Sequence, residues 1–168
     1  PELSSFEAGL NQRVLGGPMS IRAAIFDLDG TLVETAPDLH AVLAAVLAEE
    51  GAPIPALDDV RRMVGDGAKA LLVRGFAFSG QQVEGERLER LYARFLEIYV
   101  EAPCRHSFAY PGVQETLELL GDRGMALGIC TNKPQRPSEL LVEALGLRQH
   151  FQSIVGGDVL ATRKPDPA

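Results

Sequence analysis

Two carboxylates two residues apart, Asp27 and Asp29, are the residues of this chain whose types and spacing most clearly suggest chemistry. They end a short apolar run and precede Gly30, which lets the main chain turn sharply beside an anion. One carboxylate could serve as nucleophile and metal ligand, and the other as general acid and then base, as phosphoryl transfer requires. The N–H groups of residues 28–30 could form a nest for phosphate oxygens. An Asp-rich structural turn would show the same pattern, because Asp-Gly is common in turns.

Two further polar residues extend this pattern. Thr131 closes another apolar run, and its hydroxyl could donate a hydrogen bond to a phosphoryl oxygen. Lys164 lies in a proline-containing loop, where an ammonium would keep Asp27 ionised and offset phosphate charge. Taken alone, Thr131 could cap the following helix and Lys164 could be an exposed loop lysine. Together with the acid pair, they occur in the order and spacing that a phosphotransferase needs.

Short apolar segments lead into these polar residues and predict buried parallel strands at residues 22–27, 125–131 and 153–156. Helical periodicity falls between them, at residues 113–120 and 137–145. Strands that alternate with helices indicate an α/β fold with a parallel, doubly wound sheet. Ligands bind such sheets beyond the carboxyl ends of the strands, where Asp27, Thr131 and the segment 158–166 are expected.

The span from residue 35 to residue 107 shows helical patterns without an intervening strand. The predicted helices cover residues 37–51, 57–64, 68–78 and 83–100. We therefore expect a helical insertion at 35–107 in an α/β core formed by residues 19–34 and 108–168. Residues 1–18 look unlike the rest of the chain and are interpreted as a leader or tag-like segment, in which a short helix is possible.

Composition excludes several classes of partner. The net charge of −7 argues against a nucleic-acid or anionic-membrane surface, which would need excess Lys and Arg. No apolar run reaches the length of a membrane span. The two cysteines, Cys104 and Cys130, without a secretory signal, favour a reducing, cytoplasmic setting. The sequence leaves the oligomeric state open.

The sequence resembles the haloacid dehalogenase superfamily and, within it, the phosphoglycolate phosphatase group. The resemblance runs from about Ile21 to the last residue, and it is carried by Phe26–Val33 (FDLDGTLV), Val64–Ala68 (VGDGA), Cys130–Pro134 (CTNKP) and Gly156–Pro167. It implies a Rossmann-like parallel sheet with an inserted α-helical cap. The cap would close over the substrate and exclude bulk water.

The resemblance also implies roles for individual residues. Asp27 would form an aspartyl-phosphate, and Asp29 would protonate the leaving alcohol and then activate water. Thr131 and Lys164 would bind the phosphoryl group, and Mg²⁺ would sit on the Asp27 carboxylate and the Asp29 carbonyl oxygen. The further substrate-binding residues that it suggests are Gly30, Thr31, Asn132, Gly65, Gly67 and Lys69. Lys69 or Arg74 could meet a substrate carboxylate, although a solvated helix face fits both equally well.

The chain departs from the family pattern in two places. Glu34-Thr35 stands where the family often has Asp-Ser. The family also has a fourth, acidic signature on a strand after the lysine, which this chain does not reach, and Asp158 is an imperfect substitute because it precedes Lys164. We therefore expect an incomplete core that lacks C-terminal strands. Its apolar strand 23–26 would lie at an exposed edge unless the leader or another chain covers it.

The expected function is Mg²⁺-dependent hydrolysis of a small phosphorylated acid, with 2-phosphoglycolate giving glycolate and phosphate. Pyrophosphate, a sugar phosphate or an amino-sugar phosphate remains an alternative substrate, and an inactive fragment or a non-catalytic binding protein is a further alternative. A dehalogenase is disfavoured because its chemistry lacks the second acid that Asp29 supplies. A β-phosphoglucomutase is disfavoured because its histidine would fall at Leu39, with His40 one residue late.

Overall fold

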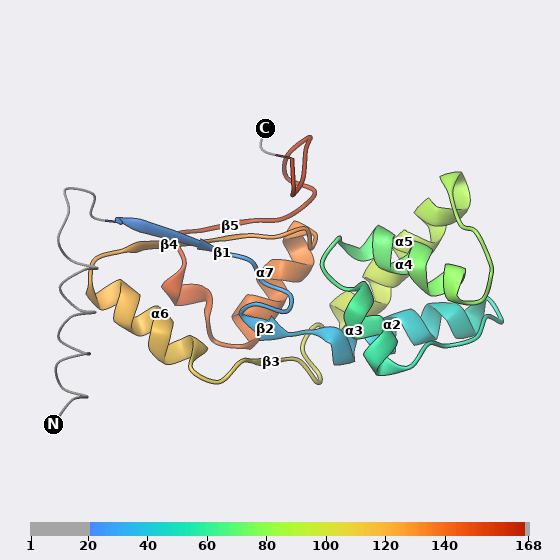
Figure 1. Ribbon diagram of the computed structural model, residues 1–168, viewed down its shortest axis with the longest axis horizontal. Helices are drawn as coiled ribbons and strands as arrows, with labels where there is room; N and C mark the ends of the chain where they lie inside the picture. Colours follow the sequence, from blue (N-terminus) through green and yellow to red (C-terminus); the bar gives the residue numbers. More distant parts are fainter. Residues whose placement is uncertain (1–20, 167–168) are drawn as a thin grey trace, which may run out of the picture.

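A computed structural model describes residues 21–166, so the leader segment 1–18 and the helix considered there lie outside the described residues. An α/β part and a helical part lie side by side along the long axis (Figure 1). The elements run in the order β1 (Ala23–Phe26), β2 (Val33–Glu34), α2 (Ala36–Glu49), α3 (Leu57–Met63), α4 (Ala68–Phe78), α5 (Gly85–Glu101), β3 (Phe108–Ala109), α6 (Val113–Asp122), β4 (Ala126–Cys130), α7 (Gln135–Ala144), the 3₁₀ helix η1 (Arg148–His150) and β5 (Ser153–Val155).

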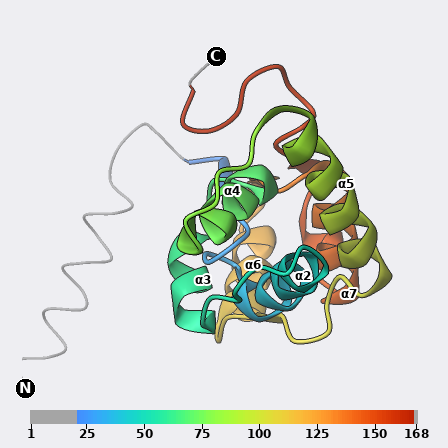
Figure 2. The same cartoon turned by 90° about the vertical axis from the view of Figure 1, so that its right-hand side faces the viewer.

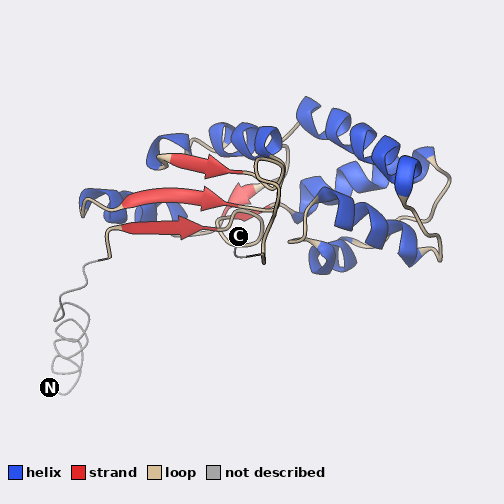
Figure 3. Cartoon of the chain, turned by 90° about the horizontal axis from the view of Figure 1, so that it is seen from above, coloured by secondary structure: helices blue, strands red, loops and turns tan. Residues whose placement is uncertain are grey.

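The predicted parallel α/β sheet is confirmed. Within residues 21–166 its order is β1-β4-β5, and both strand pairs are parallel. Phe26 pairs with Ile129, and Cys130 pairs with Val155, so the three strands end close together. All three arrows point toward the helical part, which places the carboxyl ends of the strands at the junction of the two parts (Figure 3).

One face of the sheet is packed by α6 and α7, which lie on the same side of it in Figure 1. Leu127 and Ile129 of β4 join side chains of these helices, such as Leu117 and Leu141, in one buried apolar cluster. On β1, Ile25 points away from this cluster and is 74% exposed. Among the described residues β1 pairs on one side only, so it forms an edge of the sheet, as the sequence predicted.

The helical part has a buried cluster of its own. Figure 2 views it end-on, with α2 packed against α3, α4 and α5. The buried side chains of α5 recur every four residues, as an amphipathic helix requires, at Leu91, Phe95 and Tyr99. Helices α2 and α4 approach closely at Gly75, where an added Cβ would lie 2.8 Å from a methyl carbon of Leu43.

Two chain segments connect the parts, and they pair as the antiparallel strands β2 and β3, with Val33 opposite Ala109. These strands could not be predicted from the sequence, because two residues are too few to show an alternating pattern. The Asp38 carboxylate on α2 reinforces the pairing, because it accepts hydrogen bonds from the main chain of residues 105–107 and from the Ser107 hydroxyl at 2.6 Å. The entry to the helical part and the exit from it are thereby tied together.

Candidate active site

The carboxylate of Asp27, directly after β1, meets the ammonium of Lys164 from the loop after β5. Lys164 Nζ lies 2.9 Å from Asp27 Oδ1, and the same oxygen accepts the Leu28 N–H at 2.8 Å. Both side chains of the ion pair are more than a third exposed. The sequence predicted that the Lys164 ammonium acts on Asp27, and the structure brings the two groups into direct contact.

Thr131 follows β4 at the strand end next to Asp27. Its N–H donates to the Val155 carbonyl at 3.0 Å, and its hydroxyl oxygen accepts the Lys133 N–H at 3.2 Å. The residue is 4% exposed. Thr131 therefore stabilises the turn into α7 locally, and the register of β1 and β4 sets it beside the turn that carries Asp27 and Asp29.

Most of the N–H groups in the turn after Asp27 already donate hydrogen bonds to acceptors in or beside the turn. Gly30 donates to the Val33 carbonyl at 2.8 Å, and Thr31 donates to the Leu28 carbonyl at 3.3 Å. With the Leu28 N–H on the Asp27 carboxylate, two of the three donors of the expected phosphate nest are already engaged. A phosphate nest over residues 28–30 would need these two donors to exchange their partners for phosphate oxygens, and it stays a prediction. Gly30 serves the turn through its φ of +77°.

Thr31 lies apart from the acid pair. It is exposed and lines a depression together with Phe26 and Tyr110, which differs from the cavity beside Asp29. The structure thus does not bring Thr31 to the expected substrate position.

Asn132 joins the two parts of the molecule. Its Nδ2 donates to the Gly65 carbonyl at 3.1 Å and to the Lys164 carbonyl at 3.3 Å. Gly67 passes so close that an added Cβ would lie 2.8 Å from the Asn132 carbonyl oxygen. Asn132 Oδ1 is buried and has no hydrogen-bond partner among the described residues. The loop of Gly65 and Gly67 therefore rests on the strand ends, and both glycines line the cavity beside Asp29.

Lys69 and Arg74 are engaged within the helical part. Lys69 Nζ lies 2.6 Å from Glu89 Oε1 and stands over the Tyr92 ring. The Arg74 guanidinium pairs with Asp66 and donates to the Met63 carbonyl. Neither side chain lines the cavity beside Asp29, so neither is placed to meet a substrate carboxylate there in this conformation.

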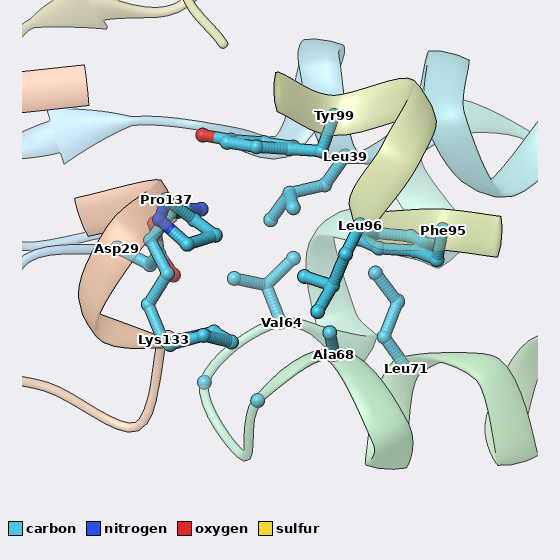
Figure 4. A pocket seen from close by; sticks show the side chains of 13 residues that line it. Asp29, Leu39, Val64, Ala68, Leu71, Phe95, Leu96, Tyr99, Lys133 and Pro137 are labelled. Atoms are coloured by element: carbon cyan, nitrogen blue, oxygen red, sulfur yellow. Dashed lines mark hydrogen bonds and ion pairs between the residues drawn. The ribbon is translucent and has the colours of Figure 1, made fainter. Parts of the chain in front are cut away.

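A cavity of about 20 Å³ lies between the two parts, with Asp29 and Lys133 on the core side (Figure 4). The Lys133 side chain is 4% exposed, and its Nζ lies 3.4 Å from Asp29 Oδ1 and 4.4 Å from the centre of the Tyr99 ring. Burial is the largest influence and would lower the pKa of Lys133, but the interactions with Asp29 and Tyr99 together outweigh it and raise the pKa. A charged lysine therefore sits beside the expected general acid.

Lys133 and Tyr99 were not among the predicted site residues. Lys133 belongs to the Thr-Asn-Lys-Pro run, so the sequence showed that it lies close to Thr131. The sequence did not show that the Lys133 side chain is buried. Tyr99 looked like one more apolar-face residue of α5. Burial raises the pKa of its phenol, and its hydroxyl has no hydrogen-bond partner among the described residues.

The acid pair would supply the oxygen ligands for a divalent cation. Residues 21–166 contain no group of three or more His, Cys, Asp and Glu side chains arranged to hold a metal. Asp158 does not substitute for the fourth signature here, because its Oδ1 accepts the Gln135 N–H at 2.7 Å and caps α7. Asp27 and Asp29 nevertheless fit Mg²⁺, which commonly binds one or two carboxylates together with water and substrate phosphate.

Comparison with known proteins identifies the class. Residues 24–168 match the haloacid dehalogenase-like hydrolase family, and the chain belongs to this family. The chain is 45% identical to the phosphoglycolate phosphatase of Caulobacter vibrioides over 141 residues, which are 84% of this chain and 60% of that protein. It is 44% identical to the phosphoglycolate phosphatase of Rhodospirillum rubrum, over 88% of this chain and 63% of the relative. The chain thus spans somewhat less than two thirds of the length of these relatives.

Solved structures show the same fold. The crystal structure of a predicted phosphoglycolate phosphatase from Haemophilus somnus 129PT superposes with a TM-score of 0.81 at 31% identity, covering 90% of this chain and 69% of that one. A putative phosphoglycolate phosphatase from Lactobacillus delbrueckii superposes with a TM-score of 0.79 at 25% identity, covering 89% of this chain and 70% of that one. Within residues 21–166, no helix is both long and apolar enough to cross a membrane.

Proposed function

We propose that this chain carries the reacting residues of a Mg²⁺-dependent phosphomonoesterase that hydrolyses 2-phosphoglycolate to glycolate and phosphate. The observation that carries the proposal is the contact of 2.9 Å between Lys164 and Asp27 at the strand ends, with Asp29 two residues further on. The relatives named phosphoglycolate phosphatase support the choice of substrate. Helices α2–α5 act as the cap over this site.

In the first step, Asp27 attacks the phosphorus atom. Its Oδ1 is held by the Lys164 ammonium and the Leu28 N–H, which leaves Oδ2 as the attacking oxygen. The bond from Oδ2 to phosphorus forms as the bond from phosphorus to the glycolate oxygen breaks, and Asp29 gives its proton to that oxygen. Lys164 offsets the charge of the phosphoryl oxygens.

In the second step, a water molecule attacks the phosphorus of the aspartyl-phosphate. Asp29 takes the proton of this water, the bond between Asp27 and phosphorus breaks, and inorganic phosphate leaves. Mg²⁺, held by the Asp27 carboxylate and the Asp29 carbonyl oxygen, would add positive charge beside the phosphoryl oxygens. The cap excludes bulk water, and Asn132 anchors the cap loop to the strand ends through the Gly65 carbonyl.

Phosphate release from 2-phosphoglycolate by the full-length protein with Mg²⁺ tests the proposal. We expect turnover that disappears when Mg²⁺ is chelated and in Asp27→Asn. The parallel substrates are pyrophosphate, glucose 6-phosphate and glucosamine 6-phosphate. Preference for one of these would replace the substrate assignment. No turnover on any of them, without Mg²⁺ binding, would contradict the phosphatase proposal and favour a non-catalytic binding protein.

A further inference from the structure

The cavity beside Asp29 has two polar groups that the proposed mechanism does not use. Lys133 enters it from the core, and Tyr99 enters it from α5 on the cap (Figure 4). The rest of the cap side of the cavity is apolar, with side chains such as Leu39, Val64 and Leu96. A cation and a phenol therefore face each other in an otherwise apolar enclosure.

Both groups retain hydrogen-bonding capacity. An ammonium has three donors, and Lys133 Nζ contacts one Asp29 oxygen at 3.4 Å and Tyr99, through the face of its ring and the nearby hydroxyl. The Tyr99 residue is 1% exposed, and its hydroxyl has no hydrogen-bond partner within residues 21–166. Buried polar groups normally have partners, so two underused donors at one cavity point to a ligand with acceptor oxygens.

The cavity also restricts the size and charge of that ligand. The cavity is small, at about 20 Å³, so only a small group enters without displacing the cap. A buried ammonium favours an anion. A carboxylate on a short carbon chain meets all three conditions, because it is small, negatively charged and rich in acceptor oxygens.

We propose that Lys133 and Tyr99 together form the subsite for the carboxylate of the leaving group, and that they make the enzyme selective for phosphoesters of small hydroxy acids. This inference rests on the proposed phosphatase function and deepens it. The phosphoryl end of the substrate lies at Asp27 and Lys164, and the carboxylate end lies in the cavity against the Lys133 ammonium and the Tyr99 hydroxyl. Asp29 stands between the two ends, beside the oxygen that it protonates. Lys133 and Tyr99 are thus specificity-determining residues rather than groups that react.

Ethyl phosphate tests this assignment, because it replaces the carboxylate of 2-phosphoglycolate by a methyl group. In the full-length protein, we expect Lys133→Met to lower kcat/KM for 2-phosphoglycolate about 100-fold, mainly through KM, since a buried charged hydrogen bond is lost. Tyr99→Phe should lower it about 10-fold, the effect of one lost hydrogen bond. Tyr99→Phe keeps the ring packing, so it tests the subsite even if Lys133→Met does not fold. For ethyl phosphate, we expect Tyr99→Phe to stay within about threefold of the unmodified protein, because no carboxylate contact is lost. Lys133→Met should lose about 10-fold less kcat/KM for ethyl phosphate than for 2-phosphoglycolate, because only the second substrate also loses a carboxylate contact.

Arg94→Met is the matched control, because it removes an exposed cation of the same cap whose guanidinium pairs with Glu49. We expect its kcat/KM for both substrates to stay within about twofold of the unmodified protein, as for most surface substitutions. An equal loss on both substrates in Lys133→Met would overturn the assignment, because it would show that Lys133 acts through Asp29. An unchanged preference for 2-phosphoglycolate in both variants would overturn it as well.

Calorimetric binding separates failure of this inference from failure of the proposed function. In the Asp27→Asn background, which cannot turn over, 2-phosphoglycolate should bind about 100-fold more weakly once Lys133→Met is added, and ethyl phosphate should bind unchanged. If the unmodified protein releases no phosphate but this difference in binding remains, the phosphatase proposal fails and the carboxylate subsite stands. Equal affinities of Asp27→Asn and of the double variant with Lys133→Met for 2-phosphoglycolate would overturn the subsite itself.

Discussion

Asp27 and Asp29 stand two residues apart but in different surroundings. Asp27 pairs with Lys164 where both side chains are more than a third exposed, and Asp29 pairs with a lysine that is 4% exposed. Asp27 is therefore open to a substrate arriving from solvent, whereas Asp29 is screened by the cap. This asymmetry suits an accessible nucleophile at Asp27.

Substitution of the two acids should separate their roles. Asp27→Asn should abolish turnover of every phosphoester, because no nucleophile remains. Asp29→Asn should lower kcat for 2-phosphoglycolate by about 10²- to 10⁴-fold, the usual effect of a general acid–base group. With p-nitrophenyl phosphate, the rate of the phosphorylation step should fall far less in Asp29→Asn, because this leaving group needs no proton.

Burst kinetics with p-nitrophenyl phosphate measure that difference. We expect Asp29→Asn to show a nitrophenol burst followed by slow turnover, because hydrolysis of the aspartyl-phosphate still needs a base. The same loss in both steps, or turnover in Asp27→Asn, would contradict the assignment of roles.

At the residue scale, the sequence predicted the contact between Asp27 and Lys164 because both residues flank strand ends of a parallel sheet. It could not predict that Lys69 and Arg74 pair with Glu89 and Asp66. A lysine on a helix has several acidic neighbours within reach, and the folded arrangement selects one of them. The burial of Lys133 could not be predicted either, because it depends on Tyr99 of the cap, which covers the lysine side chain in the folded protein.

At the scale of elements, the loop of Gly65 and Gly67 joins the cap to the strand ends through its contact with Asn132. Gly67 has a φ of +86°, and an added Cβ would lie 2.8 Å from the Asn132 carbonyl oxygen. Gly67→Ala should therefore displace this loop and lower kcat/KM by about 10-fold, because strain of this kind costs about 1–2 kcal/mol.

Gly80→Ala is the matched control for that variant. Gly80 also has a positive φ, of +74°, but nothing lies within 4 Å of its added Cβ. Both variants should lose similar thermal stability from backbone strain, and only Gly67→Ala should lose activity. Equal kcat/KM values for the two variants would argue against a role for this loop in cap closure.

The Asp38 carboxylate that ties residues 105–107 to α2 gives a pH-dependent contribution to stability. Burial alone would raise the pKa of Asp38, but the hydrogen bonds from the Ser107 hydroxyl and the main chain outweigh it and hold the pKa below its ordinary value of 3.8. The contribution is therefore complete above pH 3.8 and is lost as the pH falls below that value.

Asp38→Asn should lower the free energy of unfolding at pH 7 by about 2–3 kcal/mol, since the charged acceptor is lost. Urea unfolding between pH 7 and pH 3 measures this effect. The loss of stability on acidification should be smaller in the variant than in the unmodified protein. Parallel pH profiles for the two proteins would show that Asp38 does not supply the contribution.

The sequence predicted the helices of the cap well, because their apolar residues recur over several turns. It missed β2 and β3, which are two residues long and depend on a partner about 75 positions away for their hydrogen bonds. Asp38 was equally hidden, because an acid in the first turn of a helix is ordinary until residues 105–107 fold onto it.

At the scale of the whole molecule, two apolar clusters and a shared strand-end surface explain how the site is assembled. The helical cluster forms the cap, and the sheet cluster fixes the strand ends. Periodicity and strand–helix alternation were sufficient to predict this organisation. The position of the cap relative to the sheet was not predictable, because it depends on tertiary contacts such as those of Asn132.

The edge strand β1 gives a prediction at this scale. Ile21 and Ile25 are 76% and 74% exposed, and β1 has an unpaired edge within the described residues. An apolar free edge favours self-association. The 168-residue chain should therefore associate with rising concentration, and Ile25→Lys should reduce this association. Analytical ultracentrifugation of both proteins measures it, and a monomer at all concentrations in the unmodified chain would contradict the expectation.

The central claim, that Asp27 takes up the phosphoryl group of a small phosphoester, is tested most directly by acid quench of the full-length protein during turnover of 2-phosphoglycolate. Peptide mapping by mass spectrometry then locates any covalent phosphate. We predict one phosphoryl group on the peptide that contains Asp27, and none in Asp27→Asn. Steady phosphate release without a phosphorylated peptide, or a phosphoryl group on another residue, would contradict the account.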